Sequence, residues 1–294
     1  MLSRFSPSAA GLFIGAVVIS FSGVFVKVSQ VHPMVSAFYR VFFGCIFLAV
    51  ACGLKKEFRR MPVKNTLLAV FCGLVFGVDL FCWHFSIDYV GPGLATILGN
   101  CQVFILALAG WLIYKERLGP RFLAALPMAL AGLYMIIGMD STELTPRYLA
   151  GVGFGVLTAV SYGIFILCVR KVQSGKDGAI FYYQVVVTAS CSVFLGLAVQ
   201  GAGHSFAVPG PESLAALLGL GVLCQALAWA MIAYCLPGVD ASRAGLILLL
   251  QPALSFVWDV VLFDRPTGTA GWLGVIAVLA AIYMGMARPS LRSS

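Results

Sequence analysis

The chain has 294 residues, of which 61% are hydrophobic and 10% are charged, and its formal net charge is +8 at pH 7. A soluble globular protein carries about 25% charged residues, so this composition excludes an ordinary soluble domain. The basic excess forms no long tail or nucleic-acid motif, so we expect no nucleic-acid partner and assign the positive charge to the loops of a membrane protein.

Ten apolar segments follow one another along the chain, and each is close to the roughly 20 residues that a helix needs to cross a membrane. Short polar breaks separate the segments, and several of these breaks carry turn residues. The sequence therefore predicts an all-α integral membrane protein with ten transmembrane helices. The predicted spans are 8–30, 34–53, 65–88, 92–114, 120–139, 147–170, 178–199, 212–235, 240–262 and 269–287.

The positions of Lys and Arg predict the orientation of the spans. If both termini are cytoplasmic, fifteen of the nineteen basic residues fall in cytoplasmic segments, two fall outside and two lie within spans. Basic residues accumulate on the cytoplasmic side of membrane proteins, so we expect a multi-pass protein of the cell inner membrane with both termini in the cytoplasm. The fifteen are Arg4, Lys55, Lys56, Arg59, Arg60, Lys64, Lys115, Arg117, Arg121, Arg170, Lys171, Lys176, Arg243, Arg288 and Arg292.

Similar segments recur in the same order in the two halves of the chain. YKERLGPRFLAALPMALAGLYMIIG (114–138) parallels LFDRPTGTAGWLGVIAVLAAIYMGM (262–286), and ATILGNCQVF (95–104) parallels AGLILLLQPA (244–253). Asp79 and Trp83 match Gln225 and Trp229 at the same spacing. The order predicts two five-helix repeats, 1–145 and 146–294, which an odd number of spans forces into opposite orientations. Inverted repeats are typical of transporters with a substrate site near the middle of the membrane.

The chain also resembles a known family in three places. These are SFSGVFVKVSQVHPMVSAFYRVFF in the first two spans, and the motifs YKERLG and LFDRPTG. They make the whole chain similar to the EamA family of the drug/metabolite transporter superfamily, with one EamA-type repeat in each half. The sequence departs from the family pattern at Phe21, where Trp is usual, at Gln102-Val103, where Pro is usual, and at Asp264, where Glu is commoner.

The resemblance carries expectations about architecture and function. Spans one to four and six to nine should surround a central cavity, with spans five and ten packed outside it. Members of the family mostly export small metabolites, amino acids among them. The resemblance therefore implies secondary active export of an amino acid or related compound by alternating access. Uptake, exchange or facilitated diffusion by the same fold is the alternative.

Ionisable side chains within spans are costly in lipid and are candidates for a functional site by default. Asp79 lies in the middle of the third predicted span. Successive helical residues differ by about 100°, which places Asp79, Trp83 and Ser86 on one face and turns His84 away from it. We expect Asp79 to bind a substrate amine or a proton in the cavity, and the alternative is a structural hydrogen bond to a neighbouring span.

Other polar side chains complete the candidate site. Arg40 lies deeper than snorkelling requires, so it either pairs with an acid or binds a substrate carboxylate. His84 is a candidate proton relay or a satisfied polar contact. The full predicted cavity lining is Lys27, Arg40, Asp79, Trp83, His84, Asn100, Tyr162, Gln184, Gln225, Trp229 and Gln251.

Several chemistries have no motif in this chain. The nine cysteines are irregularly spaced within apolar runs, which argues against disulfides and a zinc site. The sequence contains no HExxH, no GxSxG and no phosphate-binding loop. We therefore expect no catalytic residues, no metal, no cofactor and no enzymatic activity. The expected partners are a small-molecule substrate, protons as coupling ion, membrane lipid and, as an open alternative, a second copy of the chain in a homodimer.

Glycine pairs four residues apart predict where the spans pack closely. Small residues at this spacing let two helix backbones approach one another in a membrane. The pairs are Gly11 and Gly15, Gly73 and Gly77, and Gly151 and Gly155.

Overall fold

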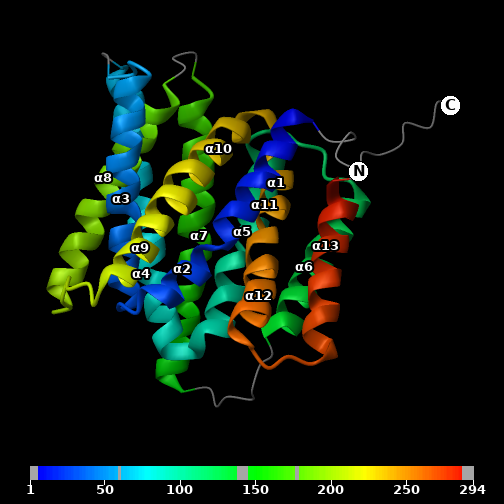
Figure 1. Ribbon diagram of the computed structural model, residues 1–294. Helices are drawn as coiled ribbons and strands as arrows, with labels where there is room; N and C mark the ends of the chain where they lie inside the picture. Colours follow the sequence, from blue (N-terminus) through cyan, green and yellow to red (C-terminus); the bar gives the residue numbers. More distant parts are fainter. Residues whose placement is uncertain (1–5, 59–60, 138–144, 176–178, 287–294) are drawn as a thin grey trace.

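The computed structural model describes residues 6–58, 61–137, 145–175 and 179–286, with the side chains of 91–93 and 137 left aside. Within these residues the chain forms a bundle of helices without strands (Figure 1). The elements are α1 (Pro7–Ser20), α2 (Ser22–Ser29), α3 (Pro33–Leu54), α4 (Val63–Asn100), α5 (Gln102–Leu112), α6 (Pro120–Ile137), α7 (Pro146–Gln173), α8 (Ile180–Gly201), α9 (Pro211–Gly219), the π-helix η2 (Leu220–Leu227), α10 (Ala228–Cys235), the 3-10 turn η3 (Leu236–Gly238), α11 (Ala241–Leu248), α12 (Leu250–Phe263) and α13 (Thr269–Met286).

The predicted spans match these helices. In the described part of the chain, nine helical segments are long and apolar enough to cross a membrane, and Pro120–Ile136 is a shorter apolar helix. Their described ends fall within three residues of the predicted ones, so the ten-helix prediction is confirmed. Outside the described residues lie the predicted ends at 138–139, 178 and 287, and the basic residues Arg4, Arg59, Arg60, Lys176, Arg288 and Arg292.

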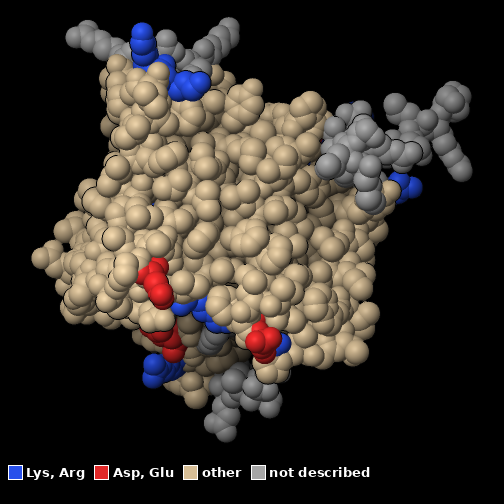
Figure 2. All heavy atoms as spheres, in the orientation of Figure 1, with Lys and Arg blue, Asp and Glu red and all other residues tan. Residues whose placement is uncertain are grey.

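The surface of the bundle fits a hydrocarbon environment. In Figure 2 a broad uncharged band separates charged atoms at the two ends of the molecule. Large apolar side chains such as Ile46, Val50 and Leu197 are exposed, and soluble monomers rarely expose apolar surface so extensively. The protein is therefore an integral membrane protein.

The long helix α4 contains two spans rather than one rod. A Cβ built on Gly99 would lie 3.8 Å from Cδ1 of Trp83. A straight helix would separate these two residues by about 24 Å, so the chain reverses direction between them. The candidate spans Val63–Val90 and Leu94–Leu112 therefore run in opposite directions and approach one another at Trp83 and Gly99.

Four spans are interrupted near their middle. The first bends at Phe21, the fourth at Cys101 and the ninth at Leu249, while the eighth contains the π-helical segment Leu220–Leu227. Cys101 and Leu249 both fall in the segments that the sequence repeat pairs. Wider π-helical turns are frequent at functional sites, so the segment Leu220–Leu227 is a candidate part of such a site.

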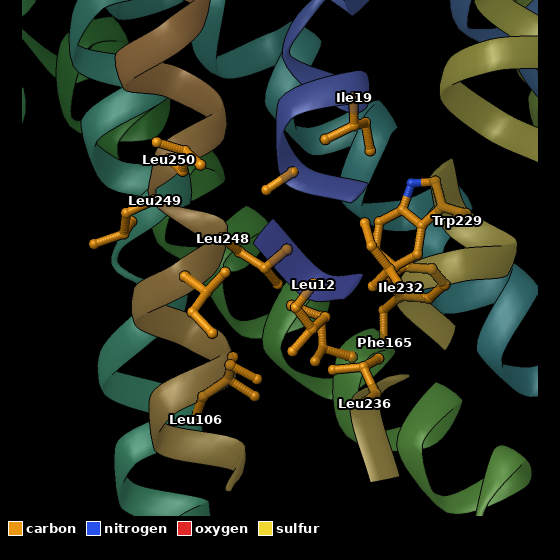
Figure 3. Close-up of a cluster of buried hydrophobic side chains, with 14 of the residues drawn as sticks. Leu12, Ile19, Leu106, Phe165, Trp229, Ile232, Leu236, Leu248, Leu249 and Leu250 are labelled. Carbon is orange, nitrogen blue, oxygen red and sulfur yellow. The ribbon is translucent and has the colours of Figure 1, made fainter. Parts of the chain in front are cut away.

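An apolar core fills the bundle on one side of that centre. Leu12, Leu106 and Leu236 are fully buried, and Figure 3 shows them with Phe165 and Leu248 in one cluster. They come from α1, α5, α7, α11 and η3, so this core joins the first five spans to the last five.

The paired glycines lie at close helix contacts, as the sequence predicts. A Cβ on Gly73 would collide with the backbone oxygen of Val187, and one on Gly77 would lie 2.6 Å from Cδ1 of Phe194. Both contacts join α4 to α8. At Gly73 the obstacle is the backbone of Val187, which cannot move aside as the end of a flexible side chain could.

We predict that Gly73→Ala destabilises the protein, because α4 and α8 must separate to admit the new methyl group. Overpacking typically costs about 1–3 kcal/mol. Gly153→Ala is the matched control, since Gly153 is helical with open space around its Cβ position. This change should be neutral or stabilising by up to about 1 kcal/mol. Thermal unfolding of the purified variants in detergent measures both effects, and equal melting temperatures would contradict the prediction.

Candidate functional site

A cavity of about 850 Å³ opens at one end of the bundle. Lys27, Asp259 and Arg265 line its mouth, where α2 and α12 end. Figure 2 shows charged atoms grouped around a recess in the lower part of this face. Pockets for small ligands measure about 300–1,000 Å³, so the cavity can hold a small organic molecule.

An ion pair at the mouth connects two distant segments. Nζ of Lys27 lies 3.2 Å from Oδ1 of Asp259, and Nη1 of Arg265 lies 3.6 Å from Oδ2. The Lys27 ammonium also lies 4.3 Å from the ring centroid of Phe263. The side chains of Lys27 and Asp259 are 51% and 32% exposed, and exposed pairs contribute at most about 1 kcal/mol. The ends of α2 and α12 are thus joined at the mouth by a weak ion pair.

One face of α4 forms a long wall of the cavity. Its lining residues recur every three or four positions and are Phe76, Asp79, Leu80, Trp83, His84 and Ile87. The predicted face was wrong in two places. His84 does line the cavity, whereas Ser86 donates a hydrogen bond of 2.9 Å to the Gly151 carbonyl at the contact with α7. The reason is that Asp79 lies near the edge of the cavity face, not at its centre.

A buried acid and a base share this cavity. Asp79 is 6% exposed and lines the cavity together with Arg40. Nε of Arg40 donates to Oε1 of Gln225 at 2.9 Å. Gln225 lies in the π-helical segment and packs against Gly44, where a Cβ would be only 2.6 Å from its Cγ. The amide of Gln225 therefore fixes the guanidinium of Arg40 from behind.

Aromatic rings form another part of the wall. Phe76 stacks on Phe165 at 4.3 Å between centroids, and Phe165 meets Trp229 edge-on at 4.8 Å. The ring centroids of Tyr162 and Trp229 lie 6.3 Å apart. Nε2 of Gln184 donates to the Trp229 backbone oxygen at 3.3 Å. Phe76, Tyr162 and Trp229 of this cluster line the same cavity as Arg40 and Asp79, so an apolar surface lies beside the polar groups.

The structure places nine of the eleven predicted residues on the cavity wall. Gln184 and Gln225 are buried and bond to Trp229 and Arg40, and that these two belong to the substrate cavity stays a prediction. Whether the nine bind substrate stays a prediction. They are Lys27, Arg40, Asp79, Trp83, His84, Asn100, Tyr162, Trp229 and Gln251.

Sequence reasoning missed five small polar residues of the wall, which are Ser22, Ser36, Thr96, Thr158 and Ser255. Ser36 and Thr158 lie one helical turn before Arg40 and Tyr162, respectively, and this i, i+4 spacing was the signal that could have found them. The hydroxyls of Ser36 and Thr158 and Nε1 of Trp229 are buried without a hydrogen-bond partner among the described residues. Buried polar atoms are normally paired, so these atoms are available to a ligand.

The outer helices differ in part from what the resemblance implies. α6 packs along α13, and Gly132 and Gly274 bring their backbones together: a Cβ on Gly132 would lie 2.7 Å from the Gly274 oxygen. However, Leu133 and Ile136 of α6 also line the cavity. The fifth span therefore contributes to the cavity and does not pack wholly outside it. In the described part of the chain, no group of three or more His, Cys, Asp and Glu could hold a metal ion.

Ten apolar helices with a ligand-sized cavity between them define a membrane transporter, and comparison with known proteins supplies its family. The sequence model of the EamA-like transporter family matches residues 7–138 and 146–286. The chain belongs to this family. The identification agrees with the motifs in the first two spans and at the ends of the fourth and ninth.

The chain is similar to several individual proteins over most of their length. Two uncharacterized transporters of Archaeoglobus fulgidus are 24% and 26% identical to it and cover 91% and 93% of this chain, which spans 93% and 94% of theirs. A probable amino-acid metabolite efflux pump of Salmonella typhimurium is 24% identical, over 83% of this chain and 84% of its own. One crystal structure matches the fold with a TM-score of 0.80 at 18% identity, covering 95% of this chain and 98% of that one.

We predict that Gln225→Leu destabilises the protein, because Nε of Arg40 then loses its hydrogen-bond partner in a buried position. Such a loss costs about 1–3 kcal/mol. Gln251→Leu is the control: it removes an amide from the same cavity wall and leaves the bond between Gln225 and Arg40 in place. Melting temperatures in detergent should fall for the first variant only, and equal losses would show that the Arg40 contact is unimportant.

Proposed function

We propose that the protein is a secondary active transporter that exports a small zwitterionic metabolite, an amino acid or a related compound, by alternating access. The observation that carries the proposal is the arrangement of Arg40 and Asp79, which bring a guanidinium group and a carboxyl group to one cavity. A carboxylate can bind the guanidinium through charge-assisted hydrogen bonds, and an ammonium group can bind the carboxylate of Asp79.

Other parts of the wall support the same substrate class. The rings of Phe76, Tyr162 and Trp229 offer an apolar surface to the rest of the molecule. The unpartnered hydroxyls of Ser36 and Thr158 supply further hydrogen-bonding groups. The Salmonella relative named as a probable amino-acid metabolite efflux pump is consistent with this substrate class and with export.

Orientation follows from the charge distribution. The basic residues gather at the end opposite the mouth, at the ends of the second, fourth and sixth spans. With both termini in the cytoplasm, the mouth faces the outer side of the inner membrane. The repeats 1–145 and 146–294 would then be the two bodies that move during alternating access.

Asp79 is also the proposed proton site, since its position allows a proton to compete with the substrate amine. Proton entry from outside would drive release of the substrate to the same side. Uptake, exchange and facilitated diffusion differ from this scheme only in direction or coupling, and transport assays separate them.

A ligand screen tests the proposed substrate class. Purified protein is heated with amino acids, with the amines that lack their carboxylate and with the acids that lack their amine. A ligand at 100 times its Kd stabilises the folded protein by about 2.7 kcal/mol, and only the zwitterions should do so. Counterflow in proteoliposomes should then return the ligand unchanged. Equal stabilisation by the amines or the acids, or chemical conversion of the ligand, would refute the proposal.

We predict that Asp79→Asn abolishes the effect of a pH gradient on flux, because the amide cannot take up a proton. Asp88→Asn on the same helix is the control, since Asp88 is exposed and lies outside the cavity lining. Substrate flux into proteoliposomes is measured with and without a pH gradient. Retention of the pH effect in Asp79→Asn would exclude this residue as the proton site.

A further inference from the structure

Among the described helices that begin at the end opposite the cavity mouth, α8 and α11 are two that have no side-chain cap from their own segment. The N-terminal N–H groups of a helix have no partner within it and need one from elsewhere. Ser6 and Thr145 cap their own helices, α1 and α7. Ala179 and Asp240, which precede α8 and α11, make no such bond, and the Asp240 carboxylate instead pairs with Arg243 at 2.9 Å.

Glu57 supplies the missing acceptor at the start of α8. Its Oε2 accepts from the backbone N–H groups of Phe181 and Tyr182 at 2.8 and 3.1 Å. Glu57 follows the second span and α8 is the seventh, so this contact joins the first five spans to the last five. A carboxylate at a helix N-terminus also gains from the helix dipole.

Glu116 does the same for α11. Its Oε1 accepts from the N–H of Ala241 at 2.7 Å, and its Oε2 accepts from the N–H and hydroxyl of Ser242 at 3.1 and 2.6 Å. Glu116 follows the fourth span and α11 begins the ninth. The second cap therefore also joins the first five spans to the last five, at the same end of the bundle (upper end in Figure 1).

A similar turn precedes each of the two glutamates and sets the direction of its side chain. Lys56 and Lys115, which precede them, have left-handed backbones with φ of 55° and 56°. The left-handed region is unfavourable for residues other than Gly, and strained residues cluster at functional positions. At Gly110 a Cβ would collide with the carboxylate of Glu116, so this position leaves the space that the carboxylate occupies.

We propose that Glu57 and Glu116 form a carboxylate latch that keeps the inner end of the transporter closed while the cavity is open at the other end. The inference rests on the proposed alternating access. Arg170 reinforces the closed end by donating to the Val239 carbonyl and stacking over Tyr114 at 4.6 Å. When the carboxylates leave α8 and α11, the first five spans lose these hydrogen bonds to the last five, and the inner end opens.

Hydrogen–deuterium exchange of the full-length protein in lipid nanodiscs tests the latch without any substrate. Gln keeps an acceptor oxygen at each position but removes the charge, so the helices can stay folded. Exchange in the first turns of α8 and α11 should rise about threefold at the affected turn in E57Q or E116Q, and about tenfold at both turns in the double variant. Exchange at the cavity mouth, between α12 and α13, should fall because the outer end closes.

The control is E212Q, which removes the same charge from an exposed position in the first turn of α9 and should change neither end. Unchanged exchange at α8 and α11 in the double variant would overturn the latch. Faster exchange there with an unchanged mouth would show two structural caps without control of the cavity. Faster exchange in every helix would show that the carboxylates hold the whole fold, which also overturns the proposal. A failed ligand screen would refute the proposed substrate class. The exchange experiment uses no substrate, so its outcomes would still test the latch.

Discussion

The structure depends on the high cost of leaving a charge unpaired away from water. Arg40 and Asp79 both lie within apolar spans, and both avoid contact with lipid by lining the cavity. Gln225 completes the arrangement by accepting from Arg40 at 2.9 Å. These residues come from the second, third and eighth spans, so the cavity brings polar side chains of three spans together.

Much of the fold could be predicted from the sequence, because the length of an apolar segment directly limits what can cross a membrane. The glycine pairs likewise predicted close contacts, since Gly73 and Gly77 permit an approach that any larger residue would prevent. Residues on the cavity wall were harder to predict. The polar character of Asp79 and Arg40 identified them, but polarity alone does not state which direction a helix face points.

The orientation of side chains on α4 and of the glutamines has a common cause. A helix fixes the angle between Asp79, His84 and Ser86, but the packing of α4 against α7 decides which angle faces the cavity. Gln184 and Gln225 have the same side chain as Gln251, yet only Gln251 lies on the wall. The π-helical turn and Gly44 set the position of Gln225, and neither effect follows from the side chain itself.

The sequence repeat allows the inner end of the bundle to be compared with the end at the cavity mouth. It pairs Glu116 with Asp264, and both follow the fourth span of their own repeat. Glu116 makes three hydrogen bonds to the start of α11, whereas Asp264 is exposed. Two acids at matching positions thus have different environments, so the local sequence alone does not decide which acid bonds to the start of a helix in the other half. If the two halves of the inverted repeat had the same conformation, both acids would have the same contacts. The arrangement of the spans therefore distinguishes the closed end from the open end.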